Sequence, residues 1–223
     1  MAFIRFHSKE INTIIFDFDG TLAELTIDFQ KMRRSIADLI VRYGLADKYL
    51  DHRFALEMIE EAGTVLEKQS SCKADTFRQE AFRIIQNIEL DAARQGALFA
   101  GTKDLFSNLR KHSIAAGIIT RNCSEAVKTI FPDISDYCQV VICRDHVRQV
   151  KPHPEQINLA IARLGGSATN SMMVGDHPLD IQTGKNAGTF SAGVLSGHFH
   201  KQDFLDAGAD LVLRQAPDIL ELI

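Results

Sequence analysis

The sequence predicts an α/β protein, in which helices flank a parallel sheet and a separate helical module is inserted after the first strand. Short, continuously apolar segments rich in β-branched residues are typical of strands buried on both faces, as in parallel sheets. Segments with helical periodicity lie between them, and this alternation indicates βαβ units. One long interval, from about residue 26 to residue 93, shows helical periodicity alone and predicts the inserted module.

The predicted sheet draws its strands from the whole chain. The segments expected to form them are residues 13–18, 114–120, 139–143, 171–175, 189–195 and 209–213. Helices are expected between them at residues 103–112, 154–164 and 178–186. Pro154 is expected at the first position of its helix, and glycines follow two of the helix ends, which is where these residue types are favoured. The connections are expected to be right-handed crossovers.

The inserted module is expected to consist of amphipathic helices. Apolar residues recur at helical spacing in stripes over residues 29–43, 55–66 and 77–88, with Phe29 opening the first stripe. Stretches near residues 44–51 and 68–75 are expected to separate the helices. We therefore predict a core domain of residues 1–24 and 94–223 and a helical domain of residues 25–93.

Composition excludes several classes of function. The net charge of −4 and the isoelectric point near 6.1 argue against a broadly basic face that binds nucleic acid. No apolar run approaches the 18 residues or so of a membrane span, and the segment MAFIRFHSKE is too short and too soon charged for a signal peptide. The four cysteines form no CxxC pair, which is typical of free thiols in a cytoplasmic protein. Nothing in the sequence indicates an oligomeric state.

Polar side chains follow four of the predicted strands at their carboxyl ends. In chain order they are Asp17 and Asp19 with Gly20 and Thr21, then Thr120, then Lys151 after a loop, then Asp176 with Asp180. Open α/β sheets bind ligands outside the carboxyl ends of their strands. Because these ends meet at one edge of the sheet, we expect the carboxylates, the hydroxyl and the ammonium group to converge there.

Such a set of groups suits phosphoryl transfer. Clustered aspartates without histidine or cysteine partners favour a hard cation such as Mg²⁺, and a carboxylate beside it can act as a nucleophile. A lysine and a hydroxyl can hold the oxygens of a transferring phosphoryl group. Gly20 allows a sharp turn that brings backbone N–H groups near those oxygens. The residues therefore predict Mg²⁺-dependent phosphoryl transfer.

The same motifs resemble the haloacid dehalogenase-like hydrolase superfamily. They are DFDGT at residues 17–21, Thr120 after an apolar strand, Lys151 in KPHP and GDxxxD at residues 175–180, in the family's order. The resemblance extends to VGDHPLDIQTGKNAG and to GADLVL near the end of the chain, and it is greatest with phosphoglycolate phosphatase-like members. It implies a Rossmann-like core and identifies the inserted module with the family's helical cap.

The resemblance also implies a role for each residue of the set. Asp17 would be the nucleophile that takes the phosphoryl group and binds Mg²⁺. Asp19 would protonate the leaving oxygen, activate the hydrolytic water, and bind the metal through its backbone carbonyl. Thr120 and Lys151 would hold the phosphoryl oxygens, with Lys151 offsetting the charge of Asp17. Asp176 would bind Mg²⁺ directly.

Further residues are expected to support this site. Asp180 would orient Lys151 or the waters of the metal, although a structural role is an alternative. Gly20 and Arg121 are candidates for phosphate binding, through backbone N–H groups and, for Arg121, also through its side chain. Arg33 in the cap is a candidate contact for an anionic substrate. Cys123, His177, His198 and His200 are expected to have ordinary structural or surface roles.

The predicted function is a Mg²⁺-dependent phosphatase that acts on a small phosphorylated metabolite, with phosphoglycolate as a candidate substrate. A phosphomutase acting on a sugar phosphate is an alternative, because both reactions use the same aspartyl phosphate. A non-catalytic binding protein of the same fold is a second alternative. An inactive homologue would be expected to lack a member of the set, and none is missing here.

Overall fold

The computed structural model describes residues 4–6, 9–45 and 54–223. The chain divides into two compact units, one of Met1–Leu25 with Gly96–Ile223 and the other of Thr26–Gln95. These bounds lie within two residues of the division that the sequence predicts.

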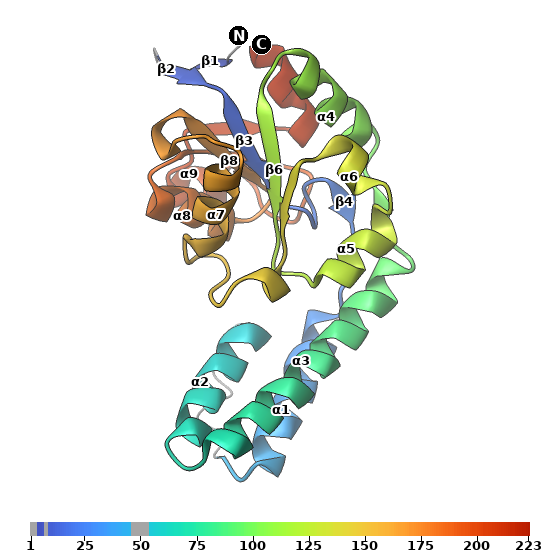
Figure 1. Cartoon of the computed structure of the whole chain (residues 1–223). Helices are drawn as coiled ribbons and strands as arrows, with labels where there is room; N and C mark the ends of the chain where they lie inside the picture. The colour runs from blue at the N-terminus through green and yellow to red at the C-terminus, as the bar shows by residue number, and fades with distance from the viewer. Residues whose placement is uncertain (1–3, 7–8, 46–53) are drawn as a thin grey trace. The chain divides into compact units, whose positions relative to one another are not determined.

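The larger unit is built on a parallel sheet, as predicted. Within the described residues, the sheet has six strands in the order β10-β9-β8-β3-β6-β7, with β3, β6 and β8 side by side at its centre (Figure 1). The strands are β3 (Thr13–Phe16), β6 (Ala115–Ile119), β7 (Val140–Ile142), β8 (Ser171–Gly175), β9 (Phe190–Val194) and β10 (Leu211–Leu213). Each lies inside its predicted segment, so the α/β fold class is confirmed.

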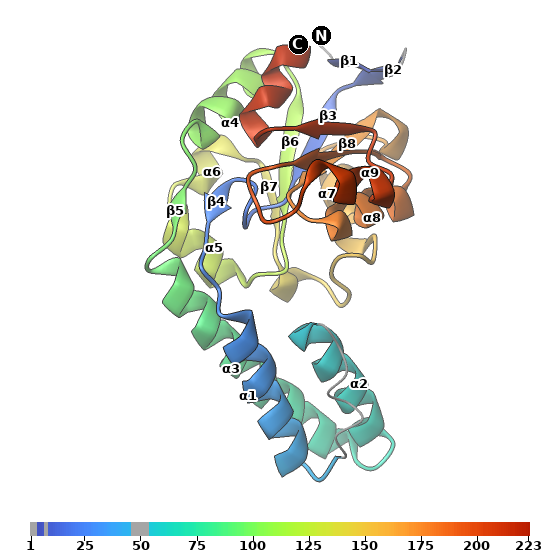
Figure 2. The ribbon, with the colours of Figure 1, turned by 180° about the vertical axis from the view of Figure 1, so that it is seen from behind.

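Both faces of this sheet are covered by helices, which explains why its strands are mostly apolar and do not alternate with exposed polar residues. Alternate residues of a strand point to opposite faces. Ile14 and Phe16 therefore pack in a core beside Phe106 of α4 (Thr102–Lys111), whereas Ile15 packs in a second core with Ile157 of α7 (Glu155–Arg163). Figure 2 shows the sheet from behind, with α4 and α7 on opposite sides of it.

The remaining helices complete these two layers. They are α5 (Ser124–Ile130), α6 (Ile134–Tyr137), α8 (Pro178–Ala187) and α9 (Lys201–Ala207), with 3₁₀ turns at Arg144–His146, Ala168–Asn170 and Ala216–Leu222. The predicted helices lie within one residue of the observed ones at each end. One detail is wrong: Pro154 is the residue before α7 rather than its first helical residue.

Two short antiparallel pairs were not predicted. Strand β1 (Ile4–Phe6) pairs with β2 (Lys9–Ile11), and β4 (Ala23–Glu24) pairs with β5 (Ala97–Leu98). The second pair joins the segment that leaves the larger unit to the segment that returns to it. These strands have two or three residues each, with the sequences IRF, KEI, AE and AL, and unlike the equally short β7 (VVI) and β10 (LVL) they show no run of β-branched apolar residues, so the sequence pattern does not reveal them.

The smaller unit consists of helices, as the sequence predicts. They are α1 (Phe29–Arg42), α2 (Ala55–Glu67) and α3 (Ser71–Ala93). Asp28 caps α1 by accepting a hydrogen bond from the Lys31 N–H at 2.8 Å. Ile36, Met58 and Phe77 are representative of its buried apolar residues.

Two expectations about this unit are wrong. Phe29 is 58% exposed rather than buried, because it is the first residue of α1 and lies beyond the packed part of the helix. The separating stretch predicted at residues 68–75 is confined to residues 68–70, because Ser70 caps α3 and the helix already begins at Ser71. The other predicted separator, residues 44–51, lies largely outside the described residues. No helix in the described part of the chain has the length and apolar character of a membrane span.

Candidate active site

Asp17 lies at the centre of the sheet's carboxyl edge. It directly follows β3, and its N–H donates to the carbonyl of Val174 in β8 at 2.8 Å, so the strand pairing extends to this residue. The next side chain, Phe18, is fully buried in the core. Asp19 is partly buried and forms a β-bridge with Ala23, at the turn out of the sheet. The buried side chain of Phe18, between the two aspartates, therefore holds the start of this turn against the core.

Lys151 links two of the predicted aspartates. Its Nζ lies 2.5 Å from Oδ1 of Asp17 and 2.6 Å from Oδ1 of Asp180, and all three side chains are at least nine-tenths buried. Lys151 comes from the loop between β7 and α7, whereas Asp17 follows β3 and Asp180 lies in α8. Three segments far apart in the sequence therefore meet in one buried ion triad.

Asp180 occupies the first turn of α8. Its second oxygen, Oδ2, accepts the His177 N–H at 3.1 Å, so the carboxylate both caps the helix and holds Lys151. Gly175 is necessary for this arrangement, because a Cβ at residue 175 would lie 2.2 Å from Asp180 Oδ2. Its contacts therefore fit two of the expected roles, the structural one and the orientation of Lys151, and a role toward the waters of the metal stays a prediction.

Asp176 follows β8 and is enclosed by backbone. A Cβ at Gly20 would lie 2.3 Å from its Oδ2, and a Cβ at Gly197 would lie 2.1 Å from the same atom. Gly20 also has φ +76°, a conformation that L side chains rarely adopt. Thr21 donates its hydroxyl to Oδ1 of Asp176 at 3.2 Å. The glycine of the DFDGT motif therefore makes room for the second acidic motif.

The electrostatics of this cluster are dominated by burial. Burial raises the pKa of Asp17 to about 6, although Lys151 acts in the opposite direction. Burial also raises the pKa of Asp176 to about 8, and repulsion from Asp17 and Asp180 adds to the shift. Burial alone would lower the pKa of Lys151, but the two neighbouring carboxylates outweigh it and hold that pKa above its ordinary value. One ammonium group thus faces three carboxylates.

The carboxylates fit a hard divalent cation. Asp17, Asp176 and Asp180 each offer an oxygen, and these oxygens lie within 4.8 Å of one another. Oxygen ligands in such a cluster suit Mg²⁺, and a cation there would favour the ionised forms of Asp17 and Asp176. Asp180 already bonds Lys151 and His177, so Asp17 and Asp176 are the carboxylates best placed to hold an ion. The backbone carbonyl of Asp19 stays a predicted ligand.

The predicted phosphate-binding residues on the next loop are held in different ways. Thr120 directly follows β6 and is buried, and its hydroxyl oxygen accepts the Asn122 N–H at 3.1 Å, which leaves the hydroxyl proton as a donor. Arg121 donates from Nη1 to the carbonyl of Lys151 at 3.1 Å, so its guanidinium ties two loops together. Arg33 lies at an exposed position of α1 in the smaller unit, and its contact with a substrate stays a prediction.

Gln156 is a site residue that the sequence analysis missed. It is fully buried in the first turn of α7, where Nε2 donates to the carbonyls of Thr120 at 2.8 Å and Ile142 at 3.1 Å. Its Oε1 accepts the Lys151 N–H at 3.2 Å. The side-chain amide of Gln156 thus holds together the ends of β6 and β7 and the backbone of the loop that carries Lys151. The available signal was a polar residue on the apolar face of a helix, five residues after Lys151.

The loop after β9 was also missed. Ser196 donates its hydroxyl to the carbonyl of Gly20 at 2.6 Å, and Gly197 lies against Asp176 as described above. This loop therefore supports both acidic motifs from the neighbouring strand. A Ser-Gly pair directly after a buried strand was its only signal in the sequence.

The residues expected to have ordinary roles have structural partners or exposed positions. Nδ1 of His177 accepts the Leu179 N–H at 2.9 Å at the start of α8, and its ring packs edge-on against Phe199. His198 and His200 are exposed, and Cys123 is buried.

A second potential metal cluster, Cys143 with Asp145 and His146, lies after β7. Two of its potential ligand residues already accept hydrogen bonds from nearby groups. His146 Nδ1 accepts the Cys143 N–H at 3.1 Å, and Asp145 accepts from the Ser124 hydroxyl at 2.5 Å.

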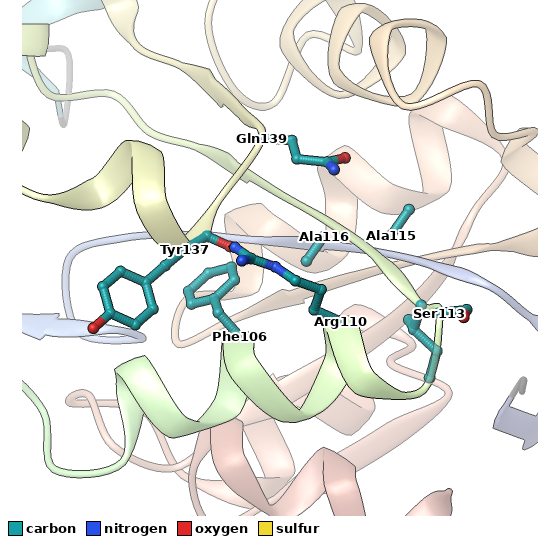
Figure 3. Close-up of a pocket in the computed structure, with 8 residues that line it drawn as sticks. Phe106, Arg110, Ser113, Ala115, Ala116, Tyr137 and Gln139 are labelled. Carbon is teal, nitrogen blue, oxygen red and sulfur yellow. The ribbon is translucent and has the colours of Figure 1, made fainter.

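A surface pocket lies at the opposite edge of the sheet, where β6 begins. Figure 3 shows its lining, which includes Phe106, Arg110, Ala115 and Tyr137. Arg110 donates from Nη2 to the carbonyl of Tyr137 at 3.1 Å and also to the carbonyl of Asp136. Because Thr120 follows the other end of β6, this pocket lies apart from the carboxylate cluster.

Comparisons with known proteins agree with this geometry. The family model described as haloacid dehalogenase-like hydrolase matches residues 14–194. An N-acetylmuramic acid 6-phosphate phosphatase from Pseudomonas putida is 26% identical over 96% of each chain. A phosphoglycolate phosphatase from Photorhabdus laumondii is 26% identical over 96% of this chain and 93% of the relative. A haloacid dehalogenase-like hydrolase from Bacteroides fragilis, 24% identical, shares the fold with a TM-score of 0.69 over 94% of this chain and 100% of that one.

Proposed function

The chain belongs to the haloacid dehalogenase-like hydrolase family, and from this premise we propose that it hydrolyses the phosphate monoester of a small metabolite with Mg²⁺, through an aspartyl phosphate. The predicted family and enzyme class are confirmed: the chain is a phosphatase of this family. The metal, the intermediate, the residue roles and the substrate are the proposed parts.

The observation that carries the proposal is the buried triad of Asp17, Lys151 and Asp180 beside Asp176. Burying charged groups is costly, and a fold retains such groups where they serve a purpose beyond stability. Lys151 holds Asp17 ionised, as a nucleophile requires, while its remaining N–H donor can bind a phosphoryl oxygen. The triad therefore supports covalent catalysis at Asp17.

The proposed reaction proceeds in two displacements. In the first, a carboxylate oxygen of Asp17 attacks phosphorus while the bond to the ester oxygen breaks, and Asp19 gives its proton to that leaving oxygen. In the second, Asp19 takes a proton from water as the water attacks the same phosphorus, and the bond to Asp17 breaks. The products are the alcohol and inorganic phosphate, and both aspartates return to their starting states.

Other groups of the site position the phosphoryl group and offset its charge. The Thr120 hydroxyl and the Lys151 ammonium donate to its non-bridging oxygens, and Asp180 holds Lys151 in place. Asp17, Asp176 and the backbone carbonyl of Asp19 would hold Mg²⁺, which supplies positive charge next to the phosphoryl oxygens when it is bound. Because the Thr120 and Lys151 donors are already held in place, they can stabilise the negative charge of the transition state without rearranging.

The substrate proposal follows the named relatives. N-Acetylmuramic acid 6-phosphate and phosphoglycolate are the substrates in the names of two relatives that align over nearly the whole chain. Both are phosphate monoesters of small hydroxy compounds that also carry a carboxylate. We therefore place small carboxylate-bearing phosphate monoesters first among the substrates.

The test is turnover of a panel of phosphorylated metabolites with Mg²⁺ and phosphate detection. The panel contains both compounds above, other sugar phosphates, nucleotides and pyrophosphate. The variant Asp17→Asn keeps the shape of the side chain but removes the nucleophile, so phosphate release should fall by at least ~10³-fold. Its thermal unfolding should remain cooperative. Near-normal turnover by this variant would contradict the proposal, and an isomerised ester in place of free phosphate would indicate a mutase.

A further inference from the structure

The side-chain amide of Asn122 stands out from the other polar groups near the site. The residue is 7% exposed, and its Nδ2 has no hydrogen-bond partner. No other buried side-chain nitrogen or oxygen in the described part of the chain is left in this state. Buried polar groups are almost always paired, because an unmade hydrogen bond leaves the cost of desolvation uncompensated. An unpaired donor near the carboxyl edge of the sheet therefore indicates that a bound ligand supplies its acceptor.

The backbone of Asn122 places this amide beside the predicted phosphoryl site. The Asn122 N–H donates to Oγ1 of Thr120 at 3.1 Å, and its carbonyl accepts the Arg144 N–H at 3.0 Å. The residue is therefore fixed on both sides, two positions after the strand that carries Thr120. The Asn122 side chain thus extends from backbone that contacts the hydroxyl that we assign to the phosphoryl oxygens.

The loop that carries Asn122 is otherwise well paired. Gln156 takes the Thr120 carbonyl, Arg144 donates from Nη1 to the Arg121 carbonyl at 3.0 Å, and Arg121 donates to the Lys151 carbonyl. Side chains from neighbouring segments thus hold this loop in place from several directions. The Nδ2 donor of Asn122 takes no part in this network, so a ligand explains it better than a structural purpose does.

We propose that Asn122 Nδ2 donates a hydrogen bond to a non-bridging phosphoryl oxygen of the substrate, next to the Thr120 hydroxyl; this inference rests on the proposed function. An amide nitrogen is a donor only, so its partner must be an acceptor. A phosphoryl group offers acceptor oxygens that carry negative charge, and a donor bound to such an oxygen forms one of the stronger hydrogen bonds. The amide adds no charge to a site in which Lys151 already supplies the cation.

This assignment predicts that replacing Asn122 weakens phosphate binding without lowering the stability of the free enzyme. In Asn122→Leu the orphan donor is replaced by an apolar group of similar size, so the free enzyme should be as stable as the wild type or more stable. The same change removes a donor to the phosphoryl group, so binding should weaken. A residue with only a structural role would show the opposite on both counts.

The experiment measures inorganic phosphate binding by calorimetry, its inhibition constant against p-nitrophenyl phosphate, and thermal unfolding, all with Mg²⁺. Asn122→Leu and Asn122→Ala should weaken phosphate binding about 10- to 100-fold. Asn122→Asp should weaken it further, because a carboxylate would face the phosphoryl oxygens. Asn170→Leu is the matched control, since Asn170 donates from Nδ2 to the Glu10 carbonyl at 2.8 Å, at the other edge of the sheet. It should lose stability and keep phosphate binding.

Each result decides between the two claims. Unchanged phosphate binding in all three Asn122 variants, with an active wild type, would overturn the role of Asn122 and leave the proposed function standing. A fall in unfolding temperature of Asn122→Leu to match that of Asn170→Leu would also overturn it. If Asn122→Leu does not fold, the alanine and aspartate variants still decide the binding result. A wild type that binds no phosphate and hydrolyses no ester would refute the proposed function itself.

Discussion

The buried ion triad and an exposed ion pair on the flanking helices hold charge in different ways. At the carboxyl edge of the sheet, Asp17, Lys151 and Asp180 are buried, and each depends on the others for its charge. On the flanking helices, Lys103 in the first turn of α4 and Asp133, just before α6, form a pair at 2.5 Å whose side chains are 43% and 38% exposed. Buried charges are costly unless paired, whereas exposed pairs contribute little to stability. The difference indicates that the fold maintains the buried triad for chemistry, whereas the exposed pair makes only a small contribution to stability.

The strongest test of this contrast is the removal of Lys151. Lys151→Met would leave the carboxylates of Asp17 and Asp180 buried without their cation, so the free energy of unfolding should fall by about 3–5 kcal/mol. Turnover should fall by at least ~10³-fold, because the nucleophile is no longer held ionised. Denaturant unfolding and phosphate release measure the two effects. A variant as stable as the wild type would show that the triad is not interdependent.

Metal removal tests the same edge through the ion it is expected to hold. EDTA should abolish turnover and excess Mg²⁺ should restore it, because Asp17 and Asp176 present their charge to a cation. Mg²⁺ should also raise the unfolding temperature of the wild type, since a ligand that binds only the folded state stabilises it. Asp176→Asn should lose most of this thermal shift. Turnover that is indifferent to chelator would count against the metal.

Gln156 tests whether the carboxyl edge depends on positioning as well as on charge. Gln156→Glu keeps an acceptor for the Lys151 N–H but loses both donors to the carbonyls of Thr120 and Ile142, so kcat should fall about 10- to 100-fold. Gln156→Leu, which loses all three bonds, should be at least as impaired. A kcat equal to that of the wild type in both variants would limit Gln156 to packing.

The exposed pair of Lys103 and Asp133 should give the smallest effect. The hydrogen bond from Lys103 holds the pKa of Asp133 below its ordinary value, so the pair's stabilisation is present at neutral pH and is lost as the pH falls through that lowered pKa. Lys103→Met should therefore lower the unfolding temperature slightly at pH 7 and low salt, less at high salt, and leave kcat unchanged. A marked loss of activity would contradict the distinction between the buried triad and the exposed pair.

The successes and failures of sequence-based prediction follow from the range of the interactions involved. The strands were predicted because two covering layers bury β3 and β8 at every position and make them apolar at all but their first residues, Thr13 and Ser171, which is a local pattern. Asp17, Lys151 and Asp176 were predicted as neighbours because parallel strands end at one edge. The start of α3 was misplaced because Ser70 caps it before the apolar stripe begins.

The residues that were missed act through contacts between distant segments. Gln156 looks like an ordinary polar residue of a helix until the ends of β6 and β7 come within reach of its amide. Gly197 acquires its importance only because Asp176, from another strand, occupies the space that a Cβ would fill. The orphan donor of Asn122 likewise exists only once the loop has folded and its neighbours have found other partners.

The sequence by itself determined the fold class, the position of the inserted helical module and the set of acidic and basic residues at the strand ends. These properties depend on local periodicity and on the order of motifs, both of which are written along the chain. Only the tertiary structure decided that Lys151 bridges Asp17 and Asp180, that glycine backbone encloses Asp176, and that one amide is left without a partner. Hydrogen bonds, burial and steric limits are properties of atoms brought together by folding, so no pattern along the chain contains them.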